Sequence, residues 1–280
     1  MANFTELEGL VMAMLVPTAK TESAHYYLKT GENCHGTLRE ARKVGAFPSV
    51  TTILGATLAR PGLENWKVAK GIESSLTLPR RENETDADFV KRVVHDMGIE
   101  TSAAAEKGTA VHALAEQVMA RKPRLLSAQL SSEMLPFWFA LEKWRDEKIT
   151  KVYNQEFVVV NEQDGYAGRC DMTAEHRDYG TVIVDFKTRG RSKPVGKKTV
   201  GIIPTREGDI LQLGAYRHGT FSDEEASDVV CLSVLIDNQT GEITEHAWTC
   251  AEAVKGYEVF CHLVAVWCWL KKYDPREVSV

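Results

Sequence analysis

Two aspartates and one lysine close two apolar segments near the middle of the chain. Asp185 and Lys187 follow the β-branched run 182–184, which is typical of a strand covered on both faces. Side chains of a strand alternate between its faces, so Asp185 and Lys187 point to one side and Phe186 to the other. Asp171 lies fourteen residues before Asp185, which suits two neighbouring strands joined by a tight turn. An isolated pair of this kind is most often an ordinary surface salt bridge, so the question is whether other groups converge there.

Two carboxylates at one sheet edge predict a site for a hard divalent cation. Proteins hold Mg²⁺ and Mn²⁺ with one or two carboxylates, completed by water and phosphate oxygens, and an added histidine nitrogen shifts the preference toward Mn²⁺. Such a cation lowers the pKa of a bound water, bridges the phosphate and steadies the leaving oxygen. Lys187 would orient the attacking water or neutralise the phosphorane. The chemistry indicated is therefore hydrolysis of a phosphate ester.

The histidine nitrogen would come from His112, on a helix predicted over residues 102–122. Apolar residues recur there at the spacing of one buried helical face, namely Val111, Leu114, Ala115 and Val118. His112 and Glu116 are four residues apart and stack beside that face. Gly108 lies one turn earlier, and because glycine inside a helix costs about 1 kcal/mol relative to alanine, we expect another group to come close to it.

The strands that carry the aspartates belong to a predicted α/β fold, with a mixed central sheet flanked by helices. Strands are predicted at 153–160, 166–175 and 181–187, and a hairpin at 228–236 and 242–248. Helices are predicted at 133–148, 207–219 and 251–273. On the second of these helices, Gln212 and Tyr216 lie on one face, four residues apart. We assign the aromatic residues of helix 133–148 to the core rather than to stacking on bases.

The first third of the chain is mostly helical by its pattern. We expect a hairpin at 23–41 and then helices at 48–59, 60–76 and 85–99. Ser49 would be the N-cap of the first of these helices, and Pro61 would open the second. No linker or repeat interrupts the chain. We therefore predict residues 1–100 as an N-terminal hairpin and helical elaboration, packed on a core formed by residues 101–280.

Four ordered segments connect this chemistry to a known family. They are G-T-A-V-H at 108–112, G-R-C-D at 168–171, V-D-F-K at 184–187 and Q-L-G-A-Y at 212–216. In residue type, order and approximate spacing they resemble the RecB-like branch of the PD-(D/E)XK nuclease superfamily, which includes phage-type and mitochondrial genome maintenance-type exonucleases. The resemblance covers residues 100–220 and extends to P-S-V-T-T-I-L at 48–54, with Leu63 and Trp66 following. It implies a restriction-endonuclease-like core and a divalent-metal-dependent DNA nuclease, with an exonuclease favoured over an endonuclease.

The resemblance also implies roles for individual residues. The ligands of Mg²⁺ or Mn²⁺ would be His112, Asp171, Asp185 and the main-chain carbonyl of Phe186. Lys187 would be the catalytic lysine, and Gln212 and Tyr216 would brace the site or touch DNA. Glu116 matches an acidic position that would lie outside the ligands. The biological roles compatible with this family are DNA repair, DNA recombination and viral genome processing.

Positive charge is concentrated directly after the second aspartate. Residues 187–206 hold seven lysines and arginines and no acidic residue, although the whole chain carries a net charge of −5. Such a segment can attract a polyanion, and a flexible solvated linker is the alternative. The residues expected to bind nucleic acid are Ser49, Thr51, Arg189, Arg191, Lys193, Lys197, Lys198 and Tyr216. For Ser49, a plain helix cap explains the sequence as well.

Composition narrows the expected compartment and cofactors. The N-terminus is unlike a signal peptide and no apolar run approaches roughly 20 residues, so we expect an intracellular, cytoplasmic protein, virus-encoded or cellular, without membrane contact. Six cysteines without a C-x₂-C pair indicate free, mostly buried thiols. Some RecB-like nucleases carry an iron–sulfur cluster, but the late cysteines are too irregularly spaced here, so none is expected. The segment 196–199 departs from a P-loop, so any motor would be a separate protein.

The expected partners are DNA, either single-stranded or with ends, and a recombination or replication protein. Two alternatives to the nuclease stay open. One is a catalytically inactive nucleic-acid-binding module of the same fold, which retention of the four central residues, His112, Asp171, Asp185 and Lys187, argues against. The other is a metal-dependent hydrolase of a small phosphate ester, which the basic segment argues against.

Overall fold

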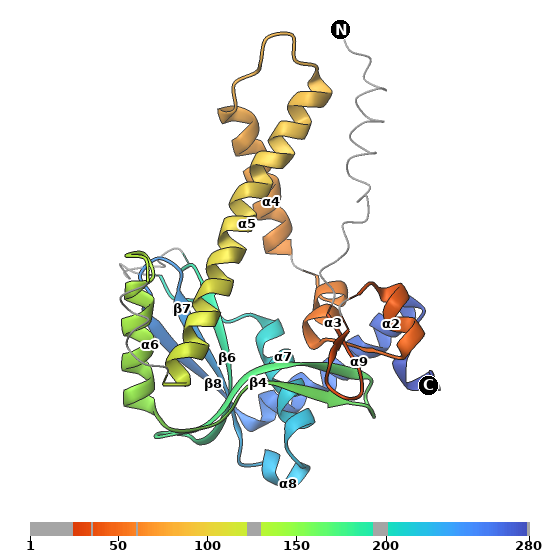
Figure 1. Cartoon of the computed structure of the whole chain (residues 1–280), viewed down its shortest axis with the longest axis vertical. Coiled ribbons are helices and arrows are strands. Elements are labelled where there is room, and N and C mark those ends of the chain that lie inside the picture. The colour runs from red at the N-terminus through yellow and green to blue at the C-terminus, as the bar shows by residue number, and fades with distance from the viewer. Residues whose placement is uncertain (1–24, 35, 60, 122–129, 193–200, 279–280) are drawn as a thin grey trace. The chain divides into compact units, whose positions relative to one another are not determined.

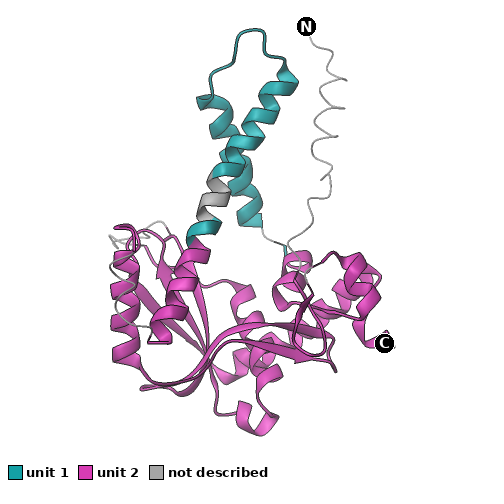
Figure 2. Cartoon of the chain, viewed as in Figure 1, with its two compact units in different colours: residues 1–22, 59–107 teal, residues 23–58, 108–280 magenta. Residues whose placement is uncertain are grey.

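The chain divides into two compact units. The structure, a computed structural model, describes residues 25–34, 36–59, 61–121, 130–192 and 201–278. One unit contains residues 1–22 and 59–107, and the other contains residues 23–58 and 108–280 (Figure 2). This division differs from the boundary predicted near residue 100. Segment 23–58 groups with the central sheet, because Ser49 forms a parallel bridge with Ala167 of that sheet.

The larger unit is built on a five-stranded mixed sheet (Figure 1). Its strands follow the order β4 (Ile149–Asn161), β5 (Tyr166–His176), β6 (Gly180–Arg189), β7 (Val230–Asp237) and β8 (Ile243–Trp248). The β6–β7 pair is parallel and the other neighbours are antiparallel. The predicted mixed sheet, including the tight turn between β5 and β6 and the hairpin of β7 and β8, is therefore confirmed.

Helices cover both faces of this sheet, as expected for an α/β fold. On one face, α6 (Leu135–Lys148) and the end of α5 (Asp86–Met119) pack against Val184 and Phe186 of β6. On the other face, α7 (Glu207–Thr220) and α9 (Cys250–Lys271) pack against Ile183. The aromatic residues Phe137, Trp138 and Trp144 of α6 are buried, in agreement with their assignment to the core. A short helix, α8 (Asp223–Ala226), follows α7.

The helix that carries His112 is longer than predicted. Two helices were expected at 85–99 and 102–122, but α5 runs without a break from Asp86 to Met119. The intervening residues include no proline, and the single Gly98 costs only about 1 kcal/mol, which does not end a helix. The close approach expected at Gly108 is also absent, because no described atom lies within 4 Å of where its Cβ would be. In the smaller unit, α4 (Pro61–Thr77) packs on α5 beside Met97.

The N-terminal part of the larger unit is a small sheet with two helices. Its strands are β1 (Tyr26–Tyr27), β2 (Asn33–Cys34) and β3 (Phe47–Pro48), and its helices are α2 (Leu38–Val44) and α3 (Val50–Thr57). The predicted N-cap is confirmed, because the Thr52 amide donates to Ser49 Oγ at 3.0 Å. This cap starts α3, which packs against α9 and α7.

The C-terminal helix α9 is long and apolar enough, by length and composition, to cross a membrane. Its core-facing side chains Phe260, Val264 and Trp267 are nevertheless buried. Two glycines let it cross α7 closely: a Cβ on Gly214 would lie 2.8 Å from the Ala253 carbonyl oxygen, and one on Gly256 would lie 2.9 Å from that of Ile210. A packed core helix passes the same length and composition test, so α9 is weak support for a membrane span. A 3₁₀ turn, η2 (Pro275–Glu277), follows it.

Candidate metal centre

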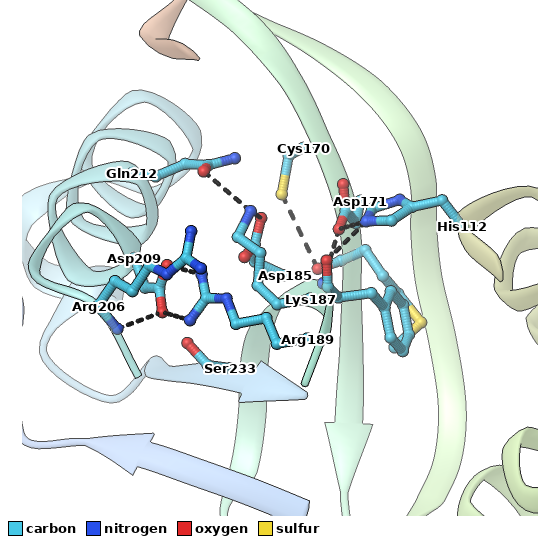
Figure 3. A network of polar contacts seen from close by, with 12 residues as sticks. His112, Cys170, Asp171, Asp185, Lys187, Arg189, Arg206, Asp209, Gln212 and Ser233 are labelled. Atoms are coloured by element: carbon cyan, nitrogen blue, oxygen red, sulfur yellow. Dashed lines mark hydrogen bonds and ion pairs between the residues drawn. The ribbon is translucent and has the colours of Figure 1, made fainter. Parts of the chain in front are cut away.

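The two aspartates predicted to meet do meet, at the point where β5 and β6 stop pairing (Figure 3). The antiparallel register ends at Met172 and Val184, and Asp171 and Asp185 are the next residues toward the open end. Beyond this point β6 continues beside β7 instead. The Phe186 amide donates to Asp171 Oδ2 at 2.8 Å, so this carboxylate replaces a strand partner for the backbone.

His112 reaches the same place from α5. Its Nε2 lies 2.6 Å from the Phe186 carbonyl oxygen and 3.7 Å from Asp171 Oδ2. A carbonyl oxygen only accepts hydrogen bonds, so Nε2 carries the hydrogen in this arrangement. To bind a cation through Nε2, His112 would shift its hydrogen to Nδ1 and release the Phe186 oxygen. Three of the predicted ligands are thus already in mutual contact.

A fourth acidic residue, Glu156 of β4, belongs to this site and was missed by the sequence analysis. Ligand atoms of His112, Glu156 and Asp171 lie within 4.8 Å of one another. Ligands on opposite sides of an Mg²⁺ ion, each about 2.1 Å away, are about 4.2 Å apart, so small shifts would let the three share one ion. The available signal was a glutamate inside the otherwise apolar end of the predicted strand 153–160.

The backbone at Glu156 is unusual in a way that serves this position. Its φ is +45°, in the left-handed region that a glutamate rarely adopts, and it lies between the regular pairs Gln155–Met172 and Phe157–Cys170. Such strain costs about 1–3 kcal/mol and persists where the surrounding structure demands it, often at functional sites. Burial and, second, the Asp171 charge raise the pKa of the Glu156 carboxyl.

Negative charge is crowded at this end of the sheet. Burial of Asp171, followed by the nearby Asp185 charge, raises the pKa of Asp171 to about 6. Asp185 is 1% exposed, and its Oδ2 has no hydrogen-bond partner among the described residues. A buried carboxylate oxygen without a donor is costly, and a cation is a partner that would satisfy it. The residues present therefore fit an oxygen-preferring divalent cation.

Lys187 occupies the opposite side of Asp185. Its Nζ donates to Asp185 Oδ1 at 2.7 Å and to Gln212 Oε1 at 3.1 Å. Burial disfavours the ammonium, but Asp185 and Asp171 outweigh it, so the pKa of Lys187 is raised and the group stays protonated. An ammonium has three N–H donors, and these contacts use two of them. Gln212, on α7, therefore positions the lysine as expected.

Tyr216 is placed as a brace and not as a contact for DNA. The ring is 2% exposed and packs directly over Gly168, where a Cβ would lie 2.8 Å from Tyr216 Cε1. Only glycine fits there, which explains the first residue of the G-R-C-D segment. Burial raises the pKa of the Tyr216 hydroxyl well above its usual value. Its expected role in binding nucleic acid is corrected accordingly, whereas its supporting role remains.

Two arginines expected to bind nucleic acid are engaged in ion pairs within the fold. Arg189 is 9% exposed and makes a bidentate pair with Asp209, with N–O distances of 2.6 and 2.5 Å. Arg191 contacts Asp237 at 2.6 Å and Glu242 at 2.7 Å. Because carboxylates already balance these charges, neither arginine is available as a free phosphate contact, and both expectations are corrected.

The remaining predicted contacts are divided between buried, exposed and undescribed positions. Ser49 is 3% exposed and its hydroxyl is occupied as a helix cap, which favours the alternative given for it. Thr51 is exposed, and its contact with a phosphate stays a prediction. Lys193, Lys197 and Lys198 lie outside the described residues. Glu116 is half-buried one turn after His112 and adds negative charge near Glu156.

Comparison with known proteins adds little. No protein-family model matches the chain, and no curated protein matches it in sequence. A solved structure described as the crystal structure of SSO0001 aligns with 72% of this chain and 86% of its own, at 14% identity and a TM-score of 0.26. A likeness at that level carries no argument about fold or function. The restriction-endonuclease-like core consequently stays an expectation.

Proposed function

We propose that this protein is a divalent-metal-dependent DNA nuclease, acting as an exonuclease inside the cell in DNA repair or recombination, on a restriction-endonuclease-like core. The observation that carries the proposal is the convergence of His112, Asp171, Asp185 and Lys187 where β5 and β6 stop pairing. These residues come from three elements, and each was expected at such a site from its type and order alone. A structural salt bridge would not require a third carboxylate, an imidazole and a peptide carbonyl around it.

The cation would be Mg²⁺ or Mn²⁺, held by Asp171, Asp185, His112 and the Phe186 carbonyl, with Glu156 close enough to join them. Bound there, it would lower the pKa of a water and neutralise charge on the phosphate. Hydrolysis adds the water oxygen to phosphorus, breaks one P–O bond of the ester, and delivers a proton to the leaving oxygen. The four oxygen ligands match what such hard cations prefer.

Lys187 would act as a charged donor in this reaction. Since its pKa is raised, it carries no lone pair at neutral pH and does not serve as the base that deprotonates water. Its unused N–H would instead hold the attacking water or a phosphate oxygen that gains charge in the transition state. Gln212 would restrict the lysine to that direction through its hydrogen bond.

End-labelled single- and double-stranded DNA, incubated with Mn²⁺, Mg²⁺ or a chelator, tests the proposal. The wild type should shorten the DNA from its ends only with metal. Asp185→Ala and Lys187→Ala should each abolish this activity while circular dichroism shows a folded protein. Lys255→Ala, at an exposed lysine on α9, is the matched control and should remain active. Metal-independent cleavage, or full activity of either site variant, would refute the assignment.

The same experiment separates the two alternatives. A catalytically inactive nucleic-acid-binding module would bind the DNA and leave it intact, and calorimetry would detect no Mn²⁺ binding at His112 and Asp171. A hydrolase of small phosphate esters would cleave p-nitrophenyl phosphate esters with metal but show no salt-dependent affinity for DNA.

A further inference from the structure

A cationic groove runs along the free edge of the sheet, outside the site described above. It has a volume of about 480 Å³ and is lined by the first half of β4 and by the ends of α5 and α6. β4 is the outermost strand, so it pairs on one side only, with β5. We define this feature as the β4 groove. Its three charged lining residues, Arg121, Arg145 and Lys151, are all basic.

Two of these basic residues have no carboxylate partner among the described residues. Arg145 is engaged, since it donates to the Val118 carbonyl at 2.7 Å and pairs with Asp146 at 2.6 Å. Its contact with Val118 also offsets the negative end of α5, which would otherwise repel an anion. Arg121 and Lys151 are exposed, and the Lys151 ammonium lies 4.9 Å from the centre of the Tyr153 ring. They differ in this respect from Arg189 and Arg191.

An aromatic ring accompanies the charge. Tyr153 is 44% exposed on the same stretch of β4, and its hydroxyl donates to Glu175 at 2.8 Å. Glu175 lies opposite Lys151 on β5 and is the nearest acidic residue in the strand register. Exposed cations beside an aromatic face are the combination that binds a nucleic-acid strand, through phosphate contacts and base stacking.

The β4 groove leads toward the candidate metal centre. Its inner end is Gln155, whose side-chain amide donates to the Glu116 carbonyl at 3.2 Å, one helical turn from His112. The next residue along β4 is Glu156, which belongs to the metal centre itself. Strands rise about 3.3 Å per residue, so Lys151 lies roughly 17 Å from Glu156 along the strand. A bound strand could therefore occupy the groove and the centre together.

We infer that the β4 groove holds the backbone of the nucleic-acid strand on one side of the bond that is cut. Arg121 and Lys151 contact its phosphates, and Tyr153 stacks on a base. This inference rests on the proposed function for its substrate class. It assigns the phosphate contacts to the edge strand β4, and not to the segment after β6 where the sequence alone suggested them.

The test measures binding of a fluorescein-labelled single-stranded oligonucleotide in a chelating buffer, over a series of KCl concentrations. Arg121→Glu with Lys151→Glu should weaken binding and reduce the slope of log affinity against log salt by about 2, because each lost phosphate contact removes about one unit. Arg121→Gln with Lys151→Gln should change the slope in the same direction, and covers the case in which charge reversal disturbs folding. Tyr153→Ala should weaken binding about tenfold with the slope unchanged.

The matched control reverses two exposed charges elsewhere in the same unit, Arg39→Glu on α2 with Lys255→Glu on α9. It should retain most of the affinity and the full slope. If the β4 groove variants match this control while the wild type cleaves DNA, the groove inference is overturned and the proposed function stands. If the groove variants lose affinity but the wild type never cleaves DNA, the function fails and the groove remains a nucleic-acid site. If the groove variants lose affinity for labelled polyglutamate but not for DNA, the groove belongs to an acidic peptide and the inference is wrong.

Discussion

Two charged clusters lie at the end of β6, only a few residues apart, and they are built very differently (Figure 3). In the Arg189–Asp209 pair, one guanidinium meets one carboxylate through two short hydrogen bonds, and the Pro204 carbonyl accepts a further one. In the candidate metal centre, Glu156, Asp171 and Asp185 crowd around the single ammonium of Lys187. The first cluster is balanced, and the second carries excess negative charge.

The difference teaches how to separate a structural ion pair from a functional one. A balanced, fully hydrogen-bonded pair needs nothing more, and its role ends with the anchoring of α7 through the Arg206 amide, which donates to Asp209 at 2.9 Å. The metal centre leaves a buried carboxylate oxygen of Asp185 without a described donor. Uncompensated buried charge is unfavourable in the free protein, so its presence indicates that a cation completes the site.

The largest effect on stability should come from breaking the balanced pair. Asp209→Ala leaves the buried Arg189 charge unpaired and should lower the free energy of unfolding by about 3–5 kcal/mol. Urea denaturation in a chelating buffer measures this loss. Arg189→Met combined with Asp209→Leu removes both charges and should recover much of it. A double variant as unstable as the single one would show that the pair contributes more than charge balance.

Glu156→Gln sharpens the other side of the comparison. Removing this charge from the unbalanced centre should reduce Mn²⁺ affinity by about 10- to 100-fold, as is usual for residues that support a metal site. Isothermal calorimetry measures the affinity, and DNA cleavage should fall with it. Glu162→Gln, at an exposed glutamate beside Lys29, is the control and should change neither. Unchanged affinity in Glu156→Gln would restrict the ligands to those implied by the sequence.

Asp171→Asn should stabilise the metal-free protein while destroying its metal site. Folding raises the pKa of Asp171 from 3.8 to about 6, so the ionised group opposes folding above pH 6, and this cost disappears as the pH falls from 6 toward 4. Asparagine cannot ionise, and a shift of that size corresponds to about 2–3 kcal/mol. Thermal unfolding with a chelator should therefore favour the variant at pH 8 and show little difference at pH 4. A variant that is less stable at pH 8 would contradict the crowding of charge.

The smallest expected effect concerns the helix cap. Ser49→Ala should cost about 1 kcal/mol of stability, because the Thr52 amide loses its acceptor. Its affinity for DNA should equal that of the wild type, since the hydroxyl is buried. Thr51→Ala, at the exposed neighbour, provides the converse test by fluorescence anisotropy. Weaker DNA binding by Ser49→Ala at unchanged stability would restore the phosphate contact that the sequence suggested.

Local periodicity was enough to predict most of the elements and the central part of the site. The β-branched run 182–184 indicated a strand buried on both faces, and alternation placed Asp185 and Lys187 together on its open side. The helical spacing from Val111 to Val118 placed His112 at the edge of a buried face. The break predicted near residue 100 was wrong, because a single glycine does not outweigh the helix formers around it.

The sequence by itself determined which residues could bind a cation and in which order they occur. Only the tertiary structure decided which charges were already balanced: Arg189 meets Asp209 from the next helix, and Glu156 meets Asp171 across a strand with an unusual backbone angle. The physical reason is that periodicity is a property of neighbouring residues, whereas charge compensation depends on which groups from distant segments face each other. A run of arginines and lysines therefore marks positive charge, and the fold determines how much of it is free to act.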